Sequence, residues 1–135
     1  MDMQTLTEKL VARKDGAIGW IVFNNPQKHN AVSLEMWEAL PMVLGEFAKD
    51  AQIRVVILKG EGEKAFISGA DISQFKEKRG SAEAVQTYNA ASDRASRALN
   101  DFPKPLIAMI RGYCVGGGLG VAAACDLRIA SDNSR

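Results

Sequence analysis

The sequence has few cysteines, one histidine and no long apolar run. Its two cysteines, Cys114 and Cys125, lie among apolar residues, so we expect buried thiols rather than a disulfide or a metal pair. The most apolar stretch, Tyr113–Cys125, is 13 residues long with four glycines, too short to span a membrane. Met1–Lys14 lacks the apolar core of a signal peptide. These absences predict a cytoplasmic chain without a membrane partner or a metal site.

An excess of charge of either sign is also missing. Lys and Arg number 17 and Asp and Glu number 16, which leaves a formal charge of +1. The basic residues are interleaved with acidic ones, whereas a nucleic-acid-binding surface needs clustered basic residues, so we expect no nucleic-acid partner. With 47% apolar and 24% charged residues, the composition is typical of one globular domain.

The first part of the chain predicts two strands followed by a helix. The strands are expected over Leu6–Lys14 and Ile18–Phe23, joined by a tight turn at Asp15-Gly16. Ser33 is placed to cap the helix, and Pro41 within it predicts a kink or a break. Apolar residues at helical spacing predict its buried face: Trp37, Leu40, Leu44 and Phe47.

A second unit follows with the same alternation. We expect a buried strand over Ile53–Lys59, a short apolar segment over Ala65–Ala70 that leads to Asp71, and a helix over Ser81–Asn100 capped by Ser81. The helical period predicts its buried face: Val85, Tyr88, Ala91, Ala95 and Leu99.

The third unit begins after Pro103 and Pro105. Strands alternating with helices predict an α/β fold. Because the last strand looks buried and no helix follows to cover it, we expect the sequence to be incomplete. The predicted elements are a strand over Leu106–Ile110, a turn over Arg111–Val115, a small-residue helix over Gly116–Ala124 and a buried strand over Leu127–Ala130.

Three consecutive glycines, Gly116–Gly118, precede the small-residue helix. Each costs about 1 kcal/mol relative to alanine in a helix, so some feature requires bare backbone there. Either the helix packs closely on the sheet, or a ligand uses exposed N–H groups at the helix N-terminus. A P-loop is excluded because Leu119 follows the last glycine. A dinucleotide fingerprint is excluded because Gly120 gives the spacing G-x-G-x-G.

Four motifs in order make the chain resemble the crotonase family of enoyl-CoA hydratases and isomerases. They are Asn24–Ala31, Ala65–Ile72, Gly112–Gly118 and Cys125–Ala130. The resemblance runs from about Leu10 to Ala130 and covers about the first half of the family's usual length. It implies a spiral of strand-strand-helix units. Residues 1–135 would then be the N-terminal part of one acyl-CoA-binding domain, truncated before the C-terminal helical region, and the complete protein a homotrimer or hexamer.

The resemblance also implies the site. Its oxyanion hole would consist of the backbone N–H groups of Ala70 and Gly117, which polarise the thioester of an acyl-CoA substrate and stabilise its enolate. Coenzyme A is part of the substrate, so no cofactor is implied. The implied substrate-binding residues are Lys28, Asn30, Ala31, Ala65, Phe66, Ser68, Gly69, Asp71, Ile72, Gly116 and Gly118.

Three side chains near this site have alternative roles. Lys28 either contacts a phosphate of coenzyme A or is a solvated loop lysine. We interpret His29 as a surface loop residue rather than a general base, because no partner is signalled nearby. Asp71 is expected to cap a short helix over Ile72–Phe75 rather than to act as a catalyst.

One departure from the family leaves the reaction open. Hydratases of the family carry a glutamate at the position held here by Gly120, and their second glutamate would lie beyond Arg135. A hydration that uses one acid and one base is therefore in doubt. A single-base isomerisation or other enolate chemistry is still compatible with the sequence. The alternatives are a non-catalytic acyl-CoA binder or scaffold member, and an α/β domain whose glycines serve packing alone.

Overall fold

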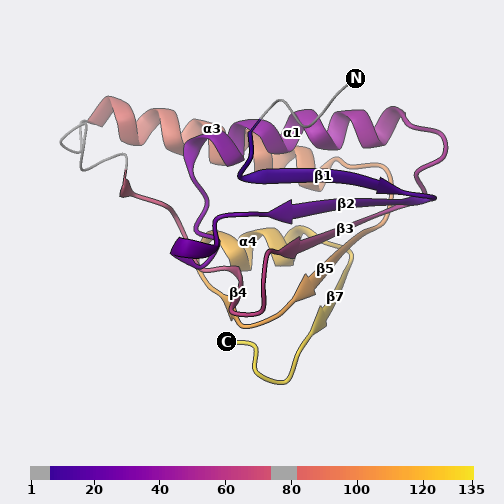
Figure 1. The fold of residues 1–135 in the computed structure, drawn as a ribbon. Coiled ribbons are helices and arrows are strands. Elements are labelled where there is room, and N and C mark those ends of the chain that lie inside the picture. The colour runs from indigo at the N-terminus through magenta and orange to yellow at the C-terminus, as the bar shows by residue number, and fades with distance from the viewer. Residues whose placement is uncertain (1–6, 74–81) are drawn as a thin grey trace.

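The computed structural model describes residues 7–73 and 82–135 and shows an α/β fold (Figure 1). Five strands form a sheet in the order β1-β2-β3-β5-β7, in which β1 is antiparallel to β2 and the other neighbours are parallel. A separate parallel pair joins β4 and β6. The elements are β1 (Leu10–Asp15), β2 (Ile18–Phe23), the 3-10 turn η2 (Pro26–Lys28), α1 (Leu34–Lys49), β3 (Val55–Gly60), β4 (Ala65–Ile67), α3 (Ala82–Asn100), β5 (Leu106–Ile110), β6 (Tyr113–Cys114), α4 (Gly117–Ala124) and β7 (Leu127–Ala130).

The first hairpin forms as predicted but starts later than expected. Gly16 has φ of 59°, the left-handed conformation that a two-residue hairpin turn requires. Strand β1 begins at Leu10, because the preceding residues form a turn in which the Thr7 hydroxyl accepts from the Lys9 N–H at 3.2 Å. Leu6 lies outside the described residues.

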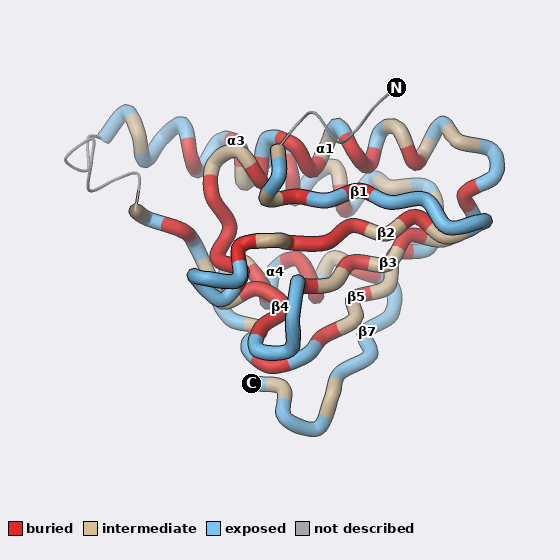
Figure 2. The backbone as a smooth tube through the Cα atoms, in the orientation of Figure 1, coloured by how far each residue is buried: buried red, intermediate tan, exposed pale blue. Residues whose placement is uncertain are grey.

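The helices cover one face of the sheet, and the core lies between the two layers. Helices α1 and α3 lie side by side, and α4 packs against β5 and the short β4–β6 pair (Figure 1). Alternate residues of the parallel strands β3 and β5 are buried, so these strands turn one side to the core (Figure 2). Within the described ranges, no helix is both long and apolar enough to cross a membrane.

Helix α1 is continuous through Pro41, so the predicted break does not occur. Burial on both sides of the proline, at Leu40 and Val43, holds the helix against the core and offsets the lost hydrogen bond. The predicted buried face of α1 is confirmed at Trp37, Leu40, Leu44 and Phe47.

The buried face of α3 is confirmed except at Val85. Tyr88, Ala91, Ala95 and Leu99 are buried, whereas Val85 is exposed. Its turn belongs to the end of α3 that projects past the other labelled elements (Figure 1), so the helical period continues beyond the part of the helix that packs on the core. The expected cap, Ser81, lies outside the described residues.

The prediction of a buried last strand is wrong for this chain. All four residues of β7 are exposed, including Leu127 and Ile129, because β7 lies at the edge of the sheet (Figure 2). Sequence analysis also missed β6, since a strand of two residues leaves no periodic pattern.

Both cysteines are free, as expected, but they differ in burial. Cys125 is buried and Cys114 is half-buried. Burial raises the pKa of the Cys125 thiol to about 12, so it stays protonated and unreactive near neutral pH. Burial also raises the pKa of Cys114.

The N-cap of α1 gives a first test. The Ser33 hydroxyl accepts from the Met36 N–H at 3.4 Å, and the Ser33 N–H donates to the Met36 sulfur. We expect Ser33→Ala to lower the free energy of unfolding by about 1 kcal/mol in urea denaturation. Ser96→Ala, on the exposed side of α3, is the matched control and should change it by less than about 0.5 kcal/mol. Equal effects of the two changes would contradict a capping role.

Candidate functional site

The loop after β4 and the start of α4 lie against each other. The Val115 N–H donates to the Ile67 carbonyl at 3.0 Å. A Cβ added to Gly116 would lie 3.6 Å from the Cα of Gly69. The fold therefore brings together the two segments that carry Ala70 and Gly117, although they are far apart in the sequence.

A backbone bridge to Val32 holds the chain on either side of Ala70. The Val32 N–H donates to the Gly69 carbonyl, and the Val32 carbonyl accepts from the Asp71 N–H, both at 2.9 Å. In a parallel bridge of this kind, Val32 bonds to the carbonyl of Gly69 and the N–H of Asp71, the residues on either side of Ala70. The N–H of Ala70 itself therefore points away from Val32. Ala70 is exposed, and no group in the described part of the chain accepts from its N–H.

Gly117 is the first residue of α4, and its N–H is unpaired among residues 7–73 and 82–135. The first N–H groups of a helix have no partner within it. The Gly118 N–H donates to the Val115 carbonyl at 2.9 Å, and the Gly120 N–H donates to the Gly116 carbonyl at 3.2 Å. The Gly117 N–H has no such acceptor among the described residues. The helix dipole makes this end favourable for a negatively charged oxygen.

Two of the three glycines are required, for different reasons. Gly116 has φ of 58° and ψ of −118°, a conformation that side chains disfavour. Gly118 is packed so closely that a Cβ there would lie 2.4 Å from the Ile67 carbonyl oxygen. A Cβ on Gly117 would meet only the Trp37 ring, at 3.2 Å. Close packing thus explains Gly118, and backbone conformation explains Gly116.

Asp71 ties the Ala70 loop to the Asn24–Ala31 loop from a buried position. Its carboxylate accepts from the Ser73 hydroxyl and N–H at 2.7 and 3.1 Å, and from Lys28 Nζ and Asn25 Nδ2, each at 3.2 Å. Burial raises the pKa of Asp71, but these hydrogen bonds outweigh it and lower the pKa to about 2. The Ser73 N–H contact is the cap expected of Asp71, while the rest of the expected helix, from residue 74 on, lies outside the described residues.

Asn30 is fully engaged inside the protein. Its Oδ1 accepts from the Asn25 N–H at 2.9 Å, and its Nδ2 donates to the carbonyls of Glu61 and Ala65 at 3.0 and 2.8 Å. The amide therefore orders the loop and has no group left for a ligand. Four other predicted binding residues are also buried, so a ligand would reach their backbone at most: Ala31, Ala65, Phe66 and Gly118.

The remaining predicted binding residues are accessible. Lys28 is exposed even though it pairs with Asp71. The others are half-buried or exposed: Ser68, Gly69, Ile72 and Gly116. His29 is confirmed as an exposed loop residue, with its ring 5.7 Å from that of Tyr113.

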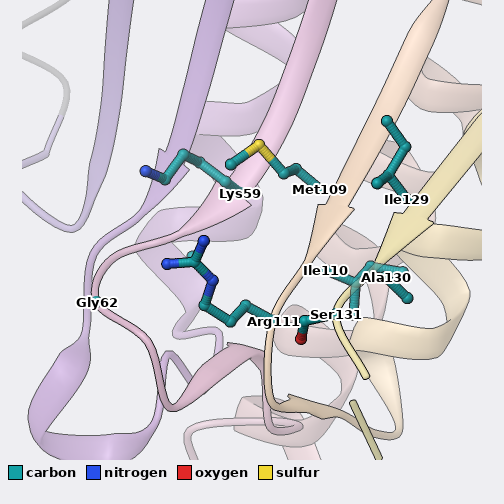
Figure 3. Close-up of a pocket in the computed structure, with 9 residues that line it drawn as sticks. Lys59, Gly62, Met109, Ile110, Arg111, Ile129, Ala130 and Ser131 are labelled. Carbon is teal, nitrogen blue, oxygen red and sulfur yellow. The ribbon is translucent and has the colours of Figure 1, made fainter. Parts of the chain in front are cut away.

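Two hollows lie near or beside this region. One, of about 270 Å³, lies between the Asn24–Ala31 loop and the loop before β4, and Pro26, His29, Asn30 and Ala65 help to line it. The other, of about 310 Å³, lies at the carboxyl ends of β3, β5 and β7, where Lys59 and Arg111 face it (Figure 3). Neither Ala70 nor Gly117 lines either hollow, so we assign neither of them to the pair of backbone N–H groups. Across the described ranges, no group of three His, Cys, Asp or Glu side chains is arranged to hold a metal ion.

Sequence analysis missed three residues that support the site. Val32 holds the Ala70 loop through its backbone, which no side-chain pattern signals. Trp37 and Tyr88 were predicted only as core residues, but Trp37 Nε1 donates to the Tyr88 hydroxyl at 2.7 Å. Helical spacing indicates burial and gives no sign of such a polar contact.

The chain belongs to the enoyl-CoA hydratase/isomerase family, whose sequence profile matches residues 13–135. The predicted family and crotonase-like fold are therefore confirmed. Among its relatives, it is 36% identical over 126 residues to the short-chain-enoyl-CoA hydratase of Clostridium acetobutylicum, a match that covers 93% of this chain and 48% of the relative. It is 35% identical over 118 residues to the (E)-benzylidenesuccinyl-CoA hydratase of Thauera aromatica, covering 87% of this chain and 45% of that protein.

A solved structure gives the same result. The enoyl-CoA hydratase/carnithine racemase of Magnetospirillum magneticum superposes with a TM-score of 0.87 and 38% identity, over 95% of this chain and 48% of that one. The chain thus spans about half the length of the curated relatives it matches.

The buried carboxylate predicts an acid-sensitive fold. Because the pKa of Asp71 is lowered in the folded state from 3.8 to about 2, its contribution is present above the unfolded pKa and is lost as pH falls through the folded pKa. We expect about 2 kcal/mol of unfolding free energy to disappear between about pH 5 and pH 2, measured by urea denaturation. Asp71→Asn should remove most of this pH dependence.

Asp50→Asn is the control for this experiment. Asp50 is a carboxylate whose pKa is lowered by its hydrogen bond from Lys14 at the surface. Exposed pairs contribute little, so this variant should keep the acid dependence of the native chain. If both variants lost it equally, the effect would not come from the Asp71 network.

Proposed function

We propose that the chain binds an acyl-CoA thioester whose carbonyl oxygen accepts from the N–H groups of Ala70 and Gly117. The observation that carries this proposal is that both N–H groups lack an acceptor in the described part of the chain, while the loops that bear them are in contact. Unpaired backbone donors at an accessible surface are suited to a ligand oxygen. Membership of the enoyl-CoA hydratase/isomerase family supplies the class of ligand.

Two backbone donors suit the chemistry of a thioester. Removal of a proton next to the thioester carbonyl, or addition to a conjugated double bond, places negative charge on the carbonyl oxygen. Fixed N–H groups stabilise this charge without changing their own protonation, and removal of one such donor typically costs about 10²–10³ in rate. The N-terminal position of Gly117 on α4 adds the favourable end of the helix dipole.

Coenzyme A would lie along the accessible edges of the two loops. Lys28 offers an exposed ammonium group for a phosphate, and Ser68 and Gly69 offer polar backbone next to Ala70. Ile72 offers an exposed apolar surface. The buried residues of the Asn24–Ala31 loop, Asn30 above all, hold this surface in shape rather than contact the ligand.

A second candidate function is acyl-CoA binding without hydration, and Gly120 favours it. A glycine has no side chain with which to transfer a proton at the position where family hydratases carry a glutamate. Turnover of an enoyl-CoA by the chain, measured as the loss of the conjugated double bond, would identify an enzyme. Tight binding without turnover would favour the binder. The relatives' names include a short-chain and an aromatic acyl group, so we propose no particular acyl chain.

Replacement of Gly117 tests the hole directly. Gly117→Pro deletes the N–H, and proline is well tolerated at the first position of a helix. We expect the Kd for butyryl-CoA, a saturated analogue, to rise about tenfold by calorimetry. Any enolate-forming turnover should fall by about 100-fold or more.

Gly117→Ala is the matched control. It adds the same Cβ against the Trp37 ring but keeps the N–H, so binding should stay within about threefold of the native chain. Equal weakening in both variants would show that the Cβ, rather than the missing N–H, is responsible, and the proposed hole would be rejected.

The space around Gly120 gives a further prediction. Among the residues that the structure describes, a Cβ at this position would meet nothing within 4 Å, and the residue lies in the first turns of α4. We expect Gly120→Glu to raise the free energy of unfolding by about 1 kcal/mol, through helix propensity and the helix dipole, measured by thermal denaturation. Gly120→Ala measures the propensity part alone. A destabilised Glu variant would contradict an open position ready for a carboxylate.

A further inference from the structure

Two buried polar side chains connect α1, α3 and the Ala70 loop. Trp37 Nε1 donates to the Tyr88 hydroxyl at 2.7 Å, and the Tyr88 hydroxyl donates to the Val32 carbonyl at 2.7 Å. The three residues are buried. This Trp37–Tyr88–Val32 chain of hydrogen bonds therefore lies inside the core, where polar contacts are stronger than in water.

Each end of this hydrogen-bond chain reaches one candidate donor. At one end, the six-membered ring of Trp37 lies against Gly117, and a Cβ added there would be 3.2 Å from Cζ2 and 3.6 Å from Cη2. At the other end, Val32 forms the backbone bridge that brackets Ala70. The same Val32 carbonyl accepts from both Tyr88 and the Asp71 N–H.

We propose that Trp37 and Tyr88 are positioning residues that fix the Ala70 and Gly117 N–H groups relative to each other. The inference rests on the proposed function, because it concerns the same oxyanion hole. An oxyanion hole works only when its donors are held within about 0.5 Å of the productive geometry. Helix α4 and the Ala70 loop belong to different segments, and the indole and phenol groups span the distance between them.

Packing alone does not explain these residue types. An apolar residue such as Phe or Leu would fill the core without a polar atom that must find a partner. Trp20, on β2, shows the contrast, since its Nε1 is buried and has no hydrogen-bond partner within residues 7–73 and 82–135. At Trp37 and Tyr88, by contrast, the polar atoms hydrogen-bond to each other, and the Tyr88 hydroxyl also donates to the backbone carbonyl of Val32.

The test uses Trp37→Phe, which removes the indole donor and breaks the hydrogen bond to Tyr88, and Tyr88→Phe, which removes the hydroxyl and breaks both hydrogen bonds. Trp20→Phe is the matched control, because it removes the same indole group from a tryptophan on β2 whose Nε1 has no hydrogen-bond partner in the described part of the chain. For each variant of the 135-residue chain, we would measure folding by circular dichroism, the Kd for butyryl-CoA, and the infrared stretch of its ¹³C-labelled thioester carbonyl. The carbonyl band reports polarisation by the two donors, which a purely structural role would not change.

We expect Trp37→Phe and Tyr88→Phe to fold, to bind butyryl-CoA with a Kd raised by less than about tenfold, and to lose most of the carbonyl band shift. Trp20→Phe should keep the native shift. A native-sized band shift in folded Trp37→Phe and Tyr88→Phe would overturn the positioning role. Failure of both to fold would also overturn it, since the pair would then stabilise the core alone.

The native chain separates this proposal from the proposed function. If the native chain did not bind butyryl-CoA, or bound it without a band shift, the oxyanion hole itself would be rejected. If the native chain shifted the band and the folded variants shifted it equally, only the positioning role of Trp37 and Tyr88 would fail.

Discussion

The site depends on the close approach between β4 and the start of α4. Gly118 lies so near the Ile67 carbonyl that a side chain there would collide with the backbone of β4. The Val115 N–H donates to the same carbonyl, so the turn before α4 is anchored to the strand that leads to Ala70. Without this approach, Gly117 would not lie next to the Ala70 loop. Gly118 is therefore a packing residue. Because it allows α4 to approach β4, the neighbouring N–H of Gly117 lies next to the Ala70 loop.

Much of the fold could be predicted from local pattern, because burial repeats at the period of the element. Strands β2, β5 and β7 and the cap at Ser33 follow from β-branched runs and capping chemistry. The pattern fails where tertiary context decides, as at exposed Val85 and at β7, whose apolar residues lie on an uncovered edge. The two-residue β6 exists only because β4 is beside it, so no local signal could reveal it.

The candidate site was predictable for a different reason, since its motifs are typical of a family. Spacing alone left packing and ligand binding as alternative explanations of the glycines, and the resemblance pointed to Ala70 and Gly117. What it did not give was the role of each neighbour. Asn30 belongs to the motif, yet its amide is engaged by Asn25, Glu61 and Ala65 within the loop. Motif membership thus indicates both ligand contacts and loop structure, and only geometry separates them.

A hole built from backbone N–H groups separates binding from proton transfer. In the hole that we propose, the donors would depend on loop conformation, which the Val32 bridge, the Asp71 network and the Trp37–Tyr88 pair would hold. None of these contacts involves position 120, where a Cβ meets nothing within 4 Å among the described residues. A change from glutamate to glycine there would therefore leave the donors in place while removing one acid-base group. Under the proposed function, the same scaffold would keep the geometry of thioester binding while other residues determine the reaction that follows.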